Sequence, residues 1–262
     1  MTHTTVDVKI EDGVAHITLN RPEAANALDL AMARDLFEAA IRCDVHGGVR
    51  AVVLTGAGRA FSAGGDVKAF AAAAERLPAY LKELTTHLHG AVSRLARMDA
   101  PVIAAVNGVA AGAGMSLACA GDIVLAAESA RFTMAYTRLG FTPDGSSTFS
   151  LARLVGLRRA QELLLTNRML TASEALAWNL VTRVVPDAAL SAEADKLARE
   201  LAAGPTRAFG GVKRLLLAAA SNGLETQMEL ETELITATAR GADGREGPAA
   251  FVAKRPPRFV GA

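Results

Sequence analysis

Two glycine-rich turns are the stretches of this sequence in which the backbone itself could do chemistry. They read VLTGAGRAFSAGGDV (residues 53–67) and VNGVAAGAGMS (residues 106–116), and each follows an apolar run. Neither fits the dinucleotide or P-loop fingerprints. If each turn ends in a free backbone N–H, the two N–H groups can face one oxygen that becomes negative, such as that of an enolate. The alternative interpretation is a pair of tight turns that need positive φ.

One carboxylate, Asp144 in LGFTPDGSST (residues 139–148), could serve as an acid/base beside these turns. Burial beside Phe141 would raise the pKa of Asp144, which suits a group that moves a proton between two carbons. The alternative is a Pro-Asp-Gly turn in which the aspartate bonds to its own backbone. Ser116 follows the second glycine turn and is predicted to be structural, because a hydroxyl of ordinary acidity is a poor general base.

The elements that must position these residues are those of an α/β fold. Strands are expected at residues 14–19, 51–56, 102–106 and 122–127, and they alternate with helices at residues 29–44 and 78–98. From Ser146 onward the pattern is mostly helical. The predicted division is a core with the site over residues 1–195 and a helical region over residues 196–262, which serves as a lid or an oligomer contact.

Composition narrows the function class. The 262 residues carry 28 basic and 27 acidic side chains, without long blocks of one sign, so neither nucleic acid nor a membrane is an expected partner. Cys43 and Cys119 are isolated in the sequence, which argues against a metal site and against a disulfide framework. With no signal-like segment at the N-terminus, a cytoplasmic protein is expected.

Five ordered motifs carry a resemblance to a known family. They read NRPEAANAL (20–28), GRAFSAGGDVK (58–68), PVIAAVNGVAAGAG (101–114), CAGDIVLAAESARF (119–132) and GLRRAQELLLTNRMLTASEALAWNLVTRVV (156–185). Together they resemble the crotonase superfamily of enoyl-CoA hydratases and isomerases, from residue 6 to the end of the chain. The resemblance implies a spiral of strand-strand-helix repeats followed by a helical trimerisation region, with trimers or pairs of trimers. It also implies acyl-CoA thioester substrates, with coenzyme A entering only as part of the substrate, and neither a metal nor a permanently bound cofactor.

The resemblance also assigns site residues. The oxyanion donors fall on the backbone N–H groups of Gly65 and Ala113. The segment that cradles coenzyme A matches Ala25, Ala63, Asp66 and Val67, and Lys254 resembles a lysine that contacts the coenzyme A phosphates, sometimes from a neighbouring subunit. The alternative for Lys254 is a solvated surface lysine.

The two catalytic glutamates of the family's hydratases are absent, because their positions hold Ser116 and Tyr136. A two-glutamate hydratase is therefore not expected. The segment around Asp144 resembles the isomerase branch, including 1,2-epoxyphenylacetyl-CoA isomerases, in which the aspartate is the acid/base.

Two alternatives to an isomerase remain open. The first is a hydrolase that resembles 4-chlorobenzoyl-CoA dehalogenase, in which Asp144 attacks an aromatic ring and His89 helps water to hydrolyse the aryl ester. Tyr136 departs from that pattern, since it replaces a tryptophan that supports the aspartate, but it is kept among the candidate catalytic residues. His89 is a candidate as well and could equally be a structural helix histidine. The second alternative is a non-catalytic acyl-CoA binder.

Overall fold

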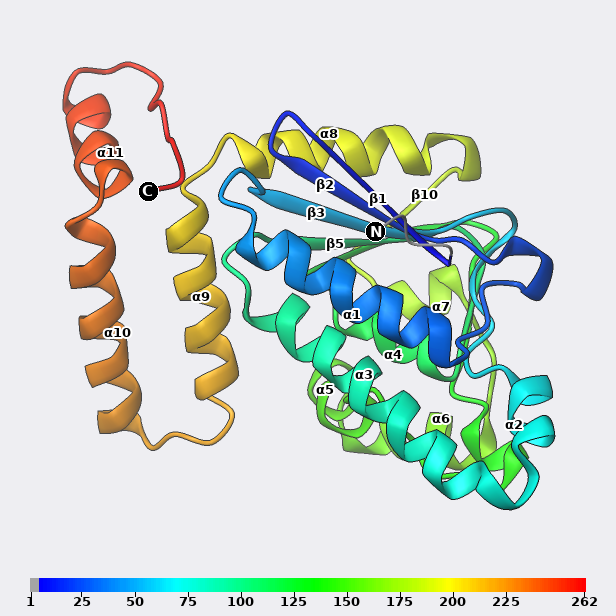
Figure 1. Cartoon of the computed structure of the whole chain (residues 1–262). Coiled ribbons are helices and arrows are strands. Elements are labelled where there is room, and N and C mark those ends of the chain that lie inside the picture. The colour runs from blue at the N-terminus through cyan, green and yellow to red at the C-terminus, as the bar shows by residue number, and fades with distance from the viewer. Residues whose placement is uncertain (1–4) are drawn as a thin grey trace.

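Two sheets form the core of the computed structural model, which describes residues 5–262 (Figure 1). The larger has six strands in the order β1-β2-β3-β5-β7-β10, and the smaller has four in the order β4-β6-β8-β9. The larger sheet consists of β1 (Val6–Glu11), β2 (Val14–Leu19), β3 (Ala51–Gly56), β5 (Val102–Val106), β7 (Ile123–Ala127) and β10 (Arg183–Val185). The smaller consists of β4 (Ala60–Ser62), β6 (Val109–Ala111), β8 (Arg131–Thr133) and β9 (Leu170–Thr171).

A repeated path along the chain links the two sheets. Strands β3, β5 and β7 pair in parallel in the large sheet, and the strand that follows each of them, β4, β6 or β8, pairs in parallel in the small sheet. The predicted α/β class is confirmed. Each strand pair is one step of a spiral, and equivalent positions of successive steps lie side by side.

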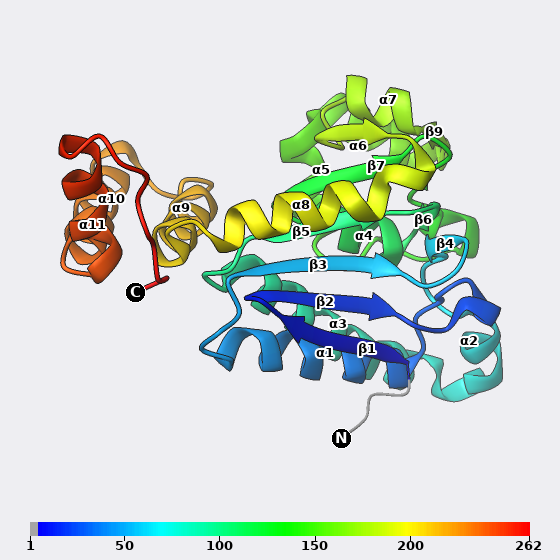
Figure 2. The same cartoon turned by 90° about the horizontal axis from the view of Figure 1, so that it is seen from above.

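Helices cover both faces of the large sheet. Helix α8 (Leu190–Ala202) lies on one face, and α1 (Leu30–Val45) and α3 (Leu77–Arg97) lie on the other (Figures 1 and 2). Strand β3 is buried along most of its length, as expected for a parallel strand covered on both faces. Helix α1 begins where the side chain of Asp29 accepts a hydrogen bond of 2.8 Å from the N–H of Met32.

Shorter helices complete the core. They are α2 (Val67–Ala73), α4 (Ala113–Cys119), α5 (Ser147–Val155), α6 (Leu157–Thr166) and α7 (Ala172–Ala177), together with the 3-10 turns η1 (Pro22–Ala24), η2 (Ala74–Arg76), η3 (Tyr136–Leu139) and η4 (Asp187–Ala189).

The last three helices form an arm beside the core (Figure 2). They are α9 (Thr206–Ala218), α10 (Leu224–Ala239) and α11 (Ala242–Val252). Helix α8 continues through residue 195 and buries Ala194 and Ala198, so the arm itself starts at α9. Phe251 and Val252 at the end of α11 are 86% and 82% exposed. An arm with large apolar side chains in water is typical of a surface that meets another protein.

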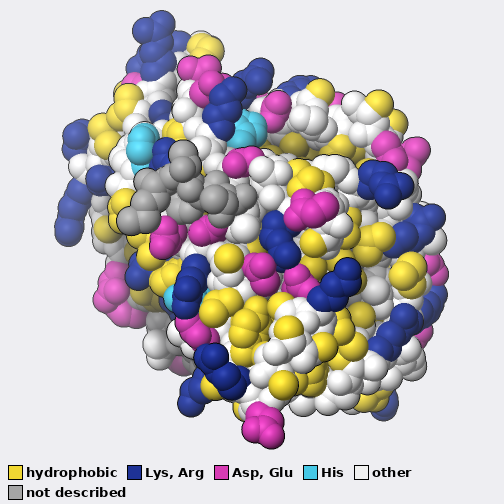
Figure 3. Space-filling model, turned by 45° about the vertical axis from the view of Figure 1, so that its right-hand side comes forward, with side chains coloured by type: hydrophobic (Ala, Val, Ile, Leu, Met, Phe, Trp, Pro, Cys, Tyr) yellow, Lys and Arg dark blue, Asp and Glu magenta, His cyan; other side chains and the backbone are white. Residues whose placement is uncertain are grey.

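The surface carries charged side chains of both signs, and the two thiols lie inside the protein. Basic and acidic side chains are interspersed on the face drawn in Figure 3. Cys43 and Cys119 are free and buried. Within residues 5–262, no group of three or more His, Cys, Asp or Glu side chains could hold a metal ion. In the same part of the chain, none of the helices is long and apolar enough to span a bilayer.

Candidate active site

A cavity of about 610 Å³ opens beside the small sheet, where the chain leaves strands β4 and β6. Its walls come from the turn after β4, from α2 and α3, from the turn after β6, and from residues 135–144. The lining includes Gly65 and Ala113 on one side and Asp144 on another. The fold thus brings together, in one cavity, three residues that the sequence separates widely.

The two glycine turns approach each other too closely for side chains. Gly64 has a φ of +90°, and a Cβ there would lie 2.6 Å from the carbonyl oxygen of Ala111. A Cβ on Gly114 would lie 2.4 Å from the carbonyl oxygen of Ser62. Backbone atoms cannot yield as the end of a flexible side chain can. The small residues of both turns are therefore required by the contact between the turns.

The N–H groups of Gly65 and Ala113 donate to no acceptor within residues 5–262. Hydrogen bonds on either side fix the first turn, because Leu28 donates to Gly64 at 2.7 Å and Asp66 donates to Leu28 at 2.9 Å. The N–H of Ala113 has no partner within its helix because it lies in the first turn of α4. Two fixed, unused donors in one cavity are the arrangement that stabilises an oxygen as it becomes negative.

Asp144 offers one free carboxylate oxygen to the cavity. Its Oδ1 accepts a hydrogen bond from the hydroxyl of Tyr136, and its Oδ2 has no partner among the residues described. Burial raises the pKa of Asp144, while the Tyr136 hydrogen bond and the charge of His89 act in the opposite direction. A carboxyl group with a raised pKa both takes up and returns a proton more readily near neutral pH.

Ser116 and Tyr136 stand beside Asp144. The Ser116 hydroxyl lies 3.0 Å from the Tyr136 hydroxyl and 3.2 Å from the carbonyl oxygens of Gly112 and Asp144. Burial, followed by the negative charge of Asp144, raises the pKa of Tyr136, so this phenol stays protonated. The contact between Ser116 and Asp144 spans 28 positions. No spacing rule reveals such a contact, and the interpretation of Ser116 as structural stays a prediction.

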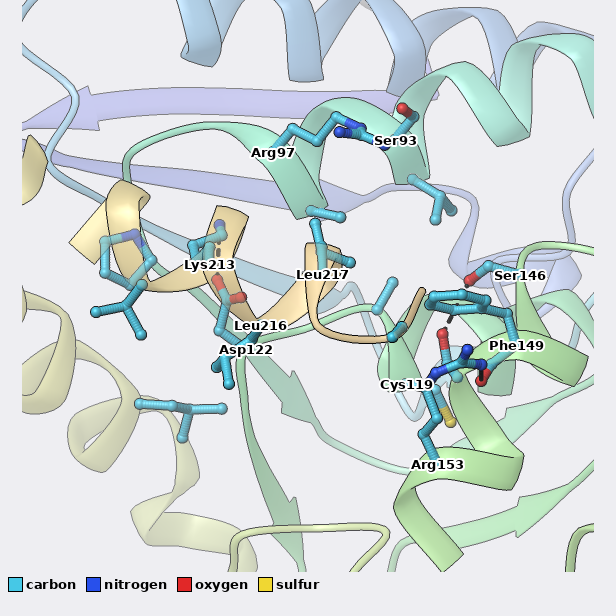
Figure 4. A pocket seen from close by; sticks show the side chains of 18 of the residues that line it. Ser93, Arg97, Cys119, Asp122, Ser146, Phe149, Arg153, Lys213, Leu216 and Leu217 are labelled. Carbon is cyan, nitrogen blue, oxygen red and sulfur yellow. Dashed lines mark hydrogen bonds and ion pairs between the residues drawn. The ribbon is translucent and has the colours of Figure 1, made fainter. Parts of the chain in front are cut away.

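His89 lies on the other side of the Asp144 loop. Its Nε2 accepts a hydrogen bond of 3.1 Å from the N–H of Gly145. It lines a second cavity of about 750 Å³ between α3, α5 and α9, and it is not among the residues that line the first. The second cavity is mainly apolar, and Lys213 and Asp122 also line it (Figure 4).

The residues expected to cradle coenzyme A divide into two groups. Ala63 and Val67 line the first cavity. Ala25 supports them, because its carbonyl oxygen accepts a hydrogen bond of 2.9 Å from the N–H of Ala63. The side chain of Asp66 points to the start of α2 and to Arg21, whose Nη2 is 3.0 Å from Oδ2. Although burial acts to raise the pKa of Asp66, the N–H of Ala69 and the Arg21 guanidinium outweigh it and lower that pKa.

Lys254 is exposed just after α11, and in Figure 1 the arm that carries it stands at the opposite end of the molecule from α2. The chain's own fold therefore does not bring Lys254 to the cavity. The expected contact with coenzyme A would have to come from a neighbouring subunit, and it stays a prediction.

Known proteins resemble this chain over nearly its whole length. A family model described as enoyl-CoA hydratase/isomerase matches residues 9–262. A 1,2-epoxyphenylacetyl-CoA isomerase of Escherichia coli (strain K12) is 42% identical, over 96% of this chain and 97% of that protein. The 4-chlorobenzoyl coenzyme A dehalogenase-2 of an Arthrobacter species is 37% identical, over 89% of this chain and 85% of that protein.

Solved structures agree with these matches. The crystal structure of an enoyl-CoA hydratase from Polaromonas sp. JS666 superposes with a TM-score of 0.92 at 34% identity, and the match covers 97% of this chain and 99% of that one. The expected crotonase-like fold is thereby confirmed. On this agreement of sequence, fold and cavity, the chain belongs to the enoyl-CoA hydratase/isomerase family of the crotonase superfamily, whose enzymes act on coenzyme A thioesters.

Proposed function

We propose that this chain is an acyl-CoA isomerase that moves a proton from one carbon of the acyl group to another. Asp144 removes the proton, the thioester oxygen takes up the negative charge as an enolate, and Asp144 returns the proton at the second carbon. The N–H groups of Gly65 and Ala113 bind the enolate oxygen. One observation carries the proposal: a carboxylate oxygen and two N–H groups that have no partner within residues 5–262 belong to residues that line the same cavity.

The remaining walls of the cavity support an apolar acyl group. Phe70, Leu84 and Phe141 belong to one small apolar cluster, and the rings of Phe70 and Phe141 meet edge to face with centroids 6.1 Å apart. Ala63 and Val67 are proposed to contact the coenzyme A portion. Two buried free thiols fit the reducing cytoplasm, which is the proposed location.

Deuterium exchange tests the proposal directly. The protein is incubated in D₂O with saturated, 2-unsaturated and 3-unsaturated acyl-CoA thioesters, and the products are analysed by mass spectrometry and NMR. We expect incorporation of deuterium and a shifted double bond with the wild type. Asp144→Asn should abolish both while thioester binding persists, because the amide cannot accept the proton. Full activity in Asp144→Asn would refute the mechanism.

A matched Asp-to-Asn change serves as the control. Asp12 lies in the turn between β1 and β2, is exposed, and has a φ of 49°. Asparagine tolerates this left-handed conformation well. Asp12→Asn should therefore keep both stability and isomerisation.

The dehalogenase alternative is tested with 4-chlorobenzoyl-CoA. It requires release of chloride and loss of that activity in His89→Ala. The geometry favours the isomerase, because Nε2 of His89 is occupied by the N–H of Gly145 and the residue lines the other cavity. A non-catalytic binder would hold thioesters tightly without any exchange of deuterium.

A further inference from the structure

We propose that Ser116 and Tyr136 are positioning residues that hold one carboxylate oxygen of Asp144, so that Oδ2 alone exchanges a proton with the substrate. This inference rests on the proposed isomerisation and adds to it the atom that acts and the residues that select it. By its resemblance to the family, the chain carries these two hydroxyls where the hydratases have glutamates. In this chain those positions would support one acid rather than supply two.

Counting protons fixes the direction of the hydrogen bond from Tyr136. An ionised carboxylate can only accept, so the single proton of the Tyr136 hydroxyl goes to Oδ1 of Asp144. Toward Ser116, 3.0 Å away, the Tyr136 oxygen can then only accept. The single proton of Ser116 has three acceptors within reach, which are the Tyr136 oxygen and the carbonyl oxygens of Gly112 and Asp144. When it goes to Tyr136, a chain of donors runs from Ser116 to Tyr136 to Asp144 and ends at Oδ1.

Packing holds this chain of donors in place. Ser116 has no exposed surface, and a Cβ on Gly145 would lie only 2.8 Å from the Cβ of Ser116. The backbone of Asp144 is held as well, because its carbonyl oxygen accepts from the Ser147 hydroxyl at 2.8 Å. On the next residue, the N–H of Gly145 donates to His89. With its backbone and Oδ1 both held, Asp144 can present Oδ2 to the cavity with little loss of side-chain freedom on binding.

The titratable and charged side chains near Asp144 come from two elements. Tyr136 and Arg138 belong to η3, and His89 and Lys82 belong to α3. Lys82 and Arg138 line the same cavity as Asp144. Among these, Tyr136 is the group that bonds the carboxylate directly. Its hydrogen bond stabilises the charged form and so opposes the effect of burial on the pKa of Asp144. Removing this bond should make the carboxylate a base only at higher pH.

The test compares pH profiles of kcat/KM for isomerisation in Tyr136→Phe and Ser116→Ala. The acid limb should move to higher pH in Tyr136→Phe, because the carboxylate loses its donor. It should move less in Ser116→Ala, in which Tyr136 still donates but is no longer polarised by Ser116. Profiles that fall equally at every pH, without movement of the limb, would show a merely structural role and overturn the proposal.

The chain's only other tyrosine provides the control. The hydroxyl of Tyr80 accepts a hydrogen bond of 3.0 Å from the N–H of Leu30, and its ring meets Phe70 with centroids 6.0 Å apart. Tyr80→Phe also removes one hydrogen-bonded hydroxyl from the neighbourhood of the cavity, but it leaves Asp144 untouched. Its acid limb should coincide with that of the wild type, and movement equal to that in Tyr136→Phe would overturn the proposal.

A second measurement separates this inference from the proposed function. Carbon-13 NMR of labelled aspartate follows the titration of the Asp144 carboxyl without any substrate, and the signal is assigned by its absence in Asp144→Asn. A titration that moves to higher pH in Tyr136→Phe supports the hydrogen-bonded pair even if no thioester reacts, in which case the isomerase proposal alone fails. An unmoved titration overturns the positioning role even if the wild type is an active isomerase.

Discussion

Lys213→Met tests what attaches the C-terminal arm to the core. Lys213 belongs to α9, and its side chain is only 7% exposed. Its Nζ lies 2.7 Å from Oδ2 of Asp122 and donates to the carbonyl oxygens of Leu95 at 2.9 Å and Ala100 at 3.0 Å (Figure 4). Methionine has a similar length but supplies none of these bonds.

The expected loss follows from leaving a carboxylate without its cation. Removing one partner of a buried ion pair costs about 3–5 kcal/mol. The Asp122 side chain is 27% exposed and keeps a hydrogen bond from the N–H of Val102, so water and the backbone recover part of that loss. We therefore expect Lys213→Met to lower the free energy of unfolding by about 3 kcal/mol near neutral pH.

The sign of the pH dependence follows from Asp122. Burial raises the pKa of Asp122 even though the charge and hydrogen bond of Lys213 oppose this, so the pKa rises further when Lys213 is lost. A carboxyl whose pKa is higher in the folded state loses stability as the pH increases through that folded value. The penalty of Lys213→Met should therefore be smallest at about pH 4, where the Asp122 carboxyl of the unfolded chain begins to ionise, and largest at about pH 8.

Urea unfolding followed by circular dichroism at several pH values measures the penalty. Lys9→Met is the matched control, because Lys9 pairs with Glu11 on the surface and such pairs contribute at most about 1 kcal/mol. The double variant Asp122→Leu with Lys213→Met should recover much of the loss, since apolar side chains can replace a buried pair. A penalty below about 0.5 kcal/mol, or one that does not change with pH, would refute this account of the attachment.

Three further predictions concern the turns, the thiols and the arm. Gly64→Ala should lower the free energy of unfolding by about 2–5 kcal/mol, because it adds a strained φ to a clash with backbone, and a variant as stable as the wild type in urea would contradict this. Burial raises the pKa of Cys119 to about 12, so a thiol reagent at about pH 8 should label it only after unfolding, and rapid native labelling would count against its burial. Phe251→Asp should shift the light-scattering mass of the assembled protein, which we propose to be a trimer, toward the monomer, whereas an unchanged mass would exclude Phe251 from the interface.

Much of the fold is readable from periodicity. The strands at residues 14–19, 51–56 and 102–106 form at the residues predicted, and α1 (Leu30–Val45) lies within one residue of the helix expected at 29–44. Strands β4, β6 and β8 escaped prediction because three residues are too few to show an alternating pattern. They look like turns in the sequence, although they build the sheet beside which the cavity lies.

Some residues of the candidate site are likewise visible in the sequence, whereas their contacts are not. Gly65 and Ala113 are marked by turns that exclude side chains, and Asp144 is marked by its Pro-Asp-Gly segment. The contact of Tyr136 with Asp144 depends on the path through η3, where Ala135 has a φ of 52°. No local pattern predicts a left-handed alanine. The link from Ser116 to both residues arises only once α4 is packed against this loop.

The pairing of β4 with β6 has a consequence for how enzymes on this scaffold can diversify. Parallel neighbours in a sheet are held about 4.8 Å apart by their ladder, so the turns that follow these two strands, and the donors in them, start from a common edge. A mutation that separates the two turns also has to disturb the pairing of the strands. Residues 116, 136 and 144 lie outside the strands of that ladder, so their side chains can change without disturbing it. Under the proposed function, a scaffold of this kind keeps the two N–H donors for the thioester oxygen and acquires a new reaction when the side chains beside them are replaced.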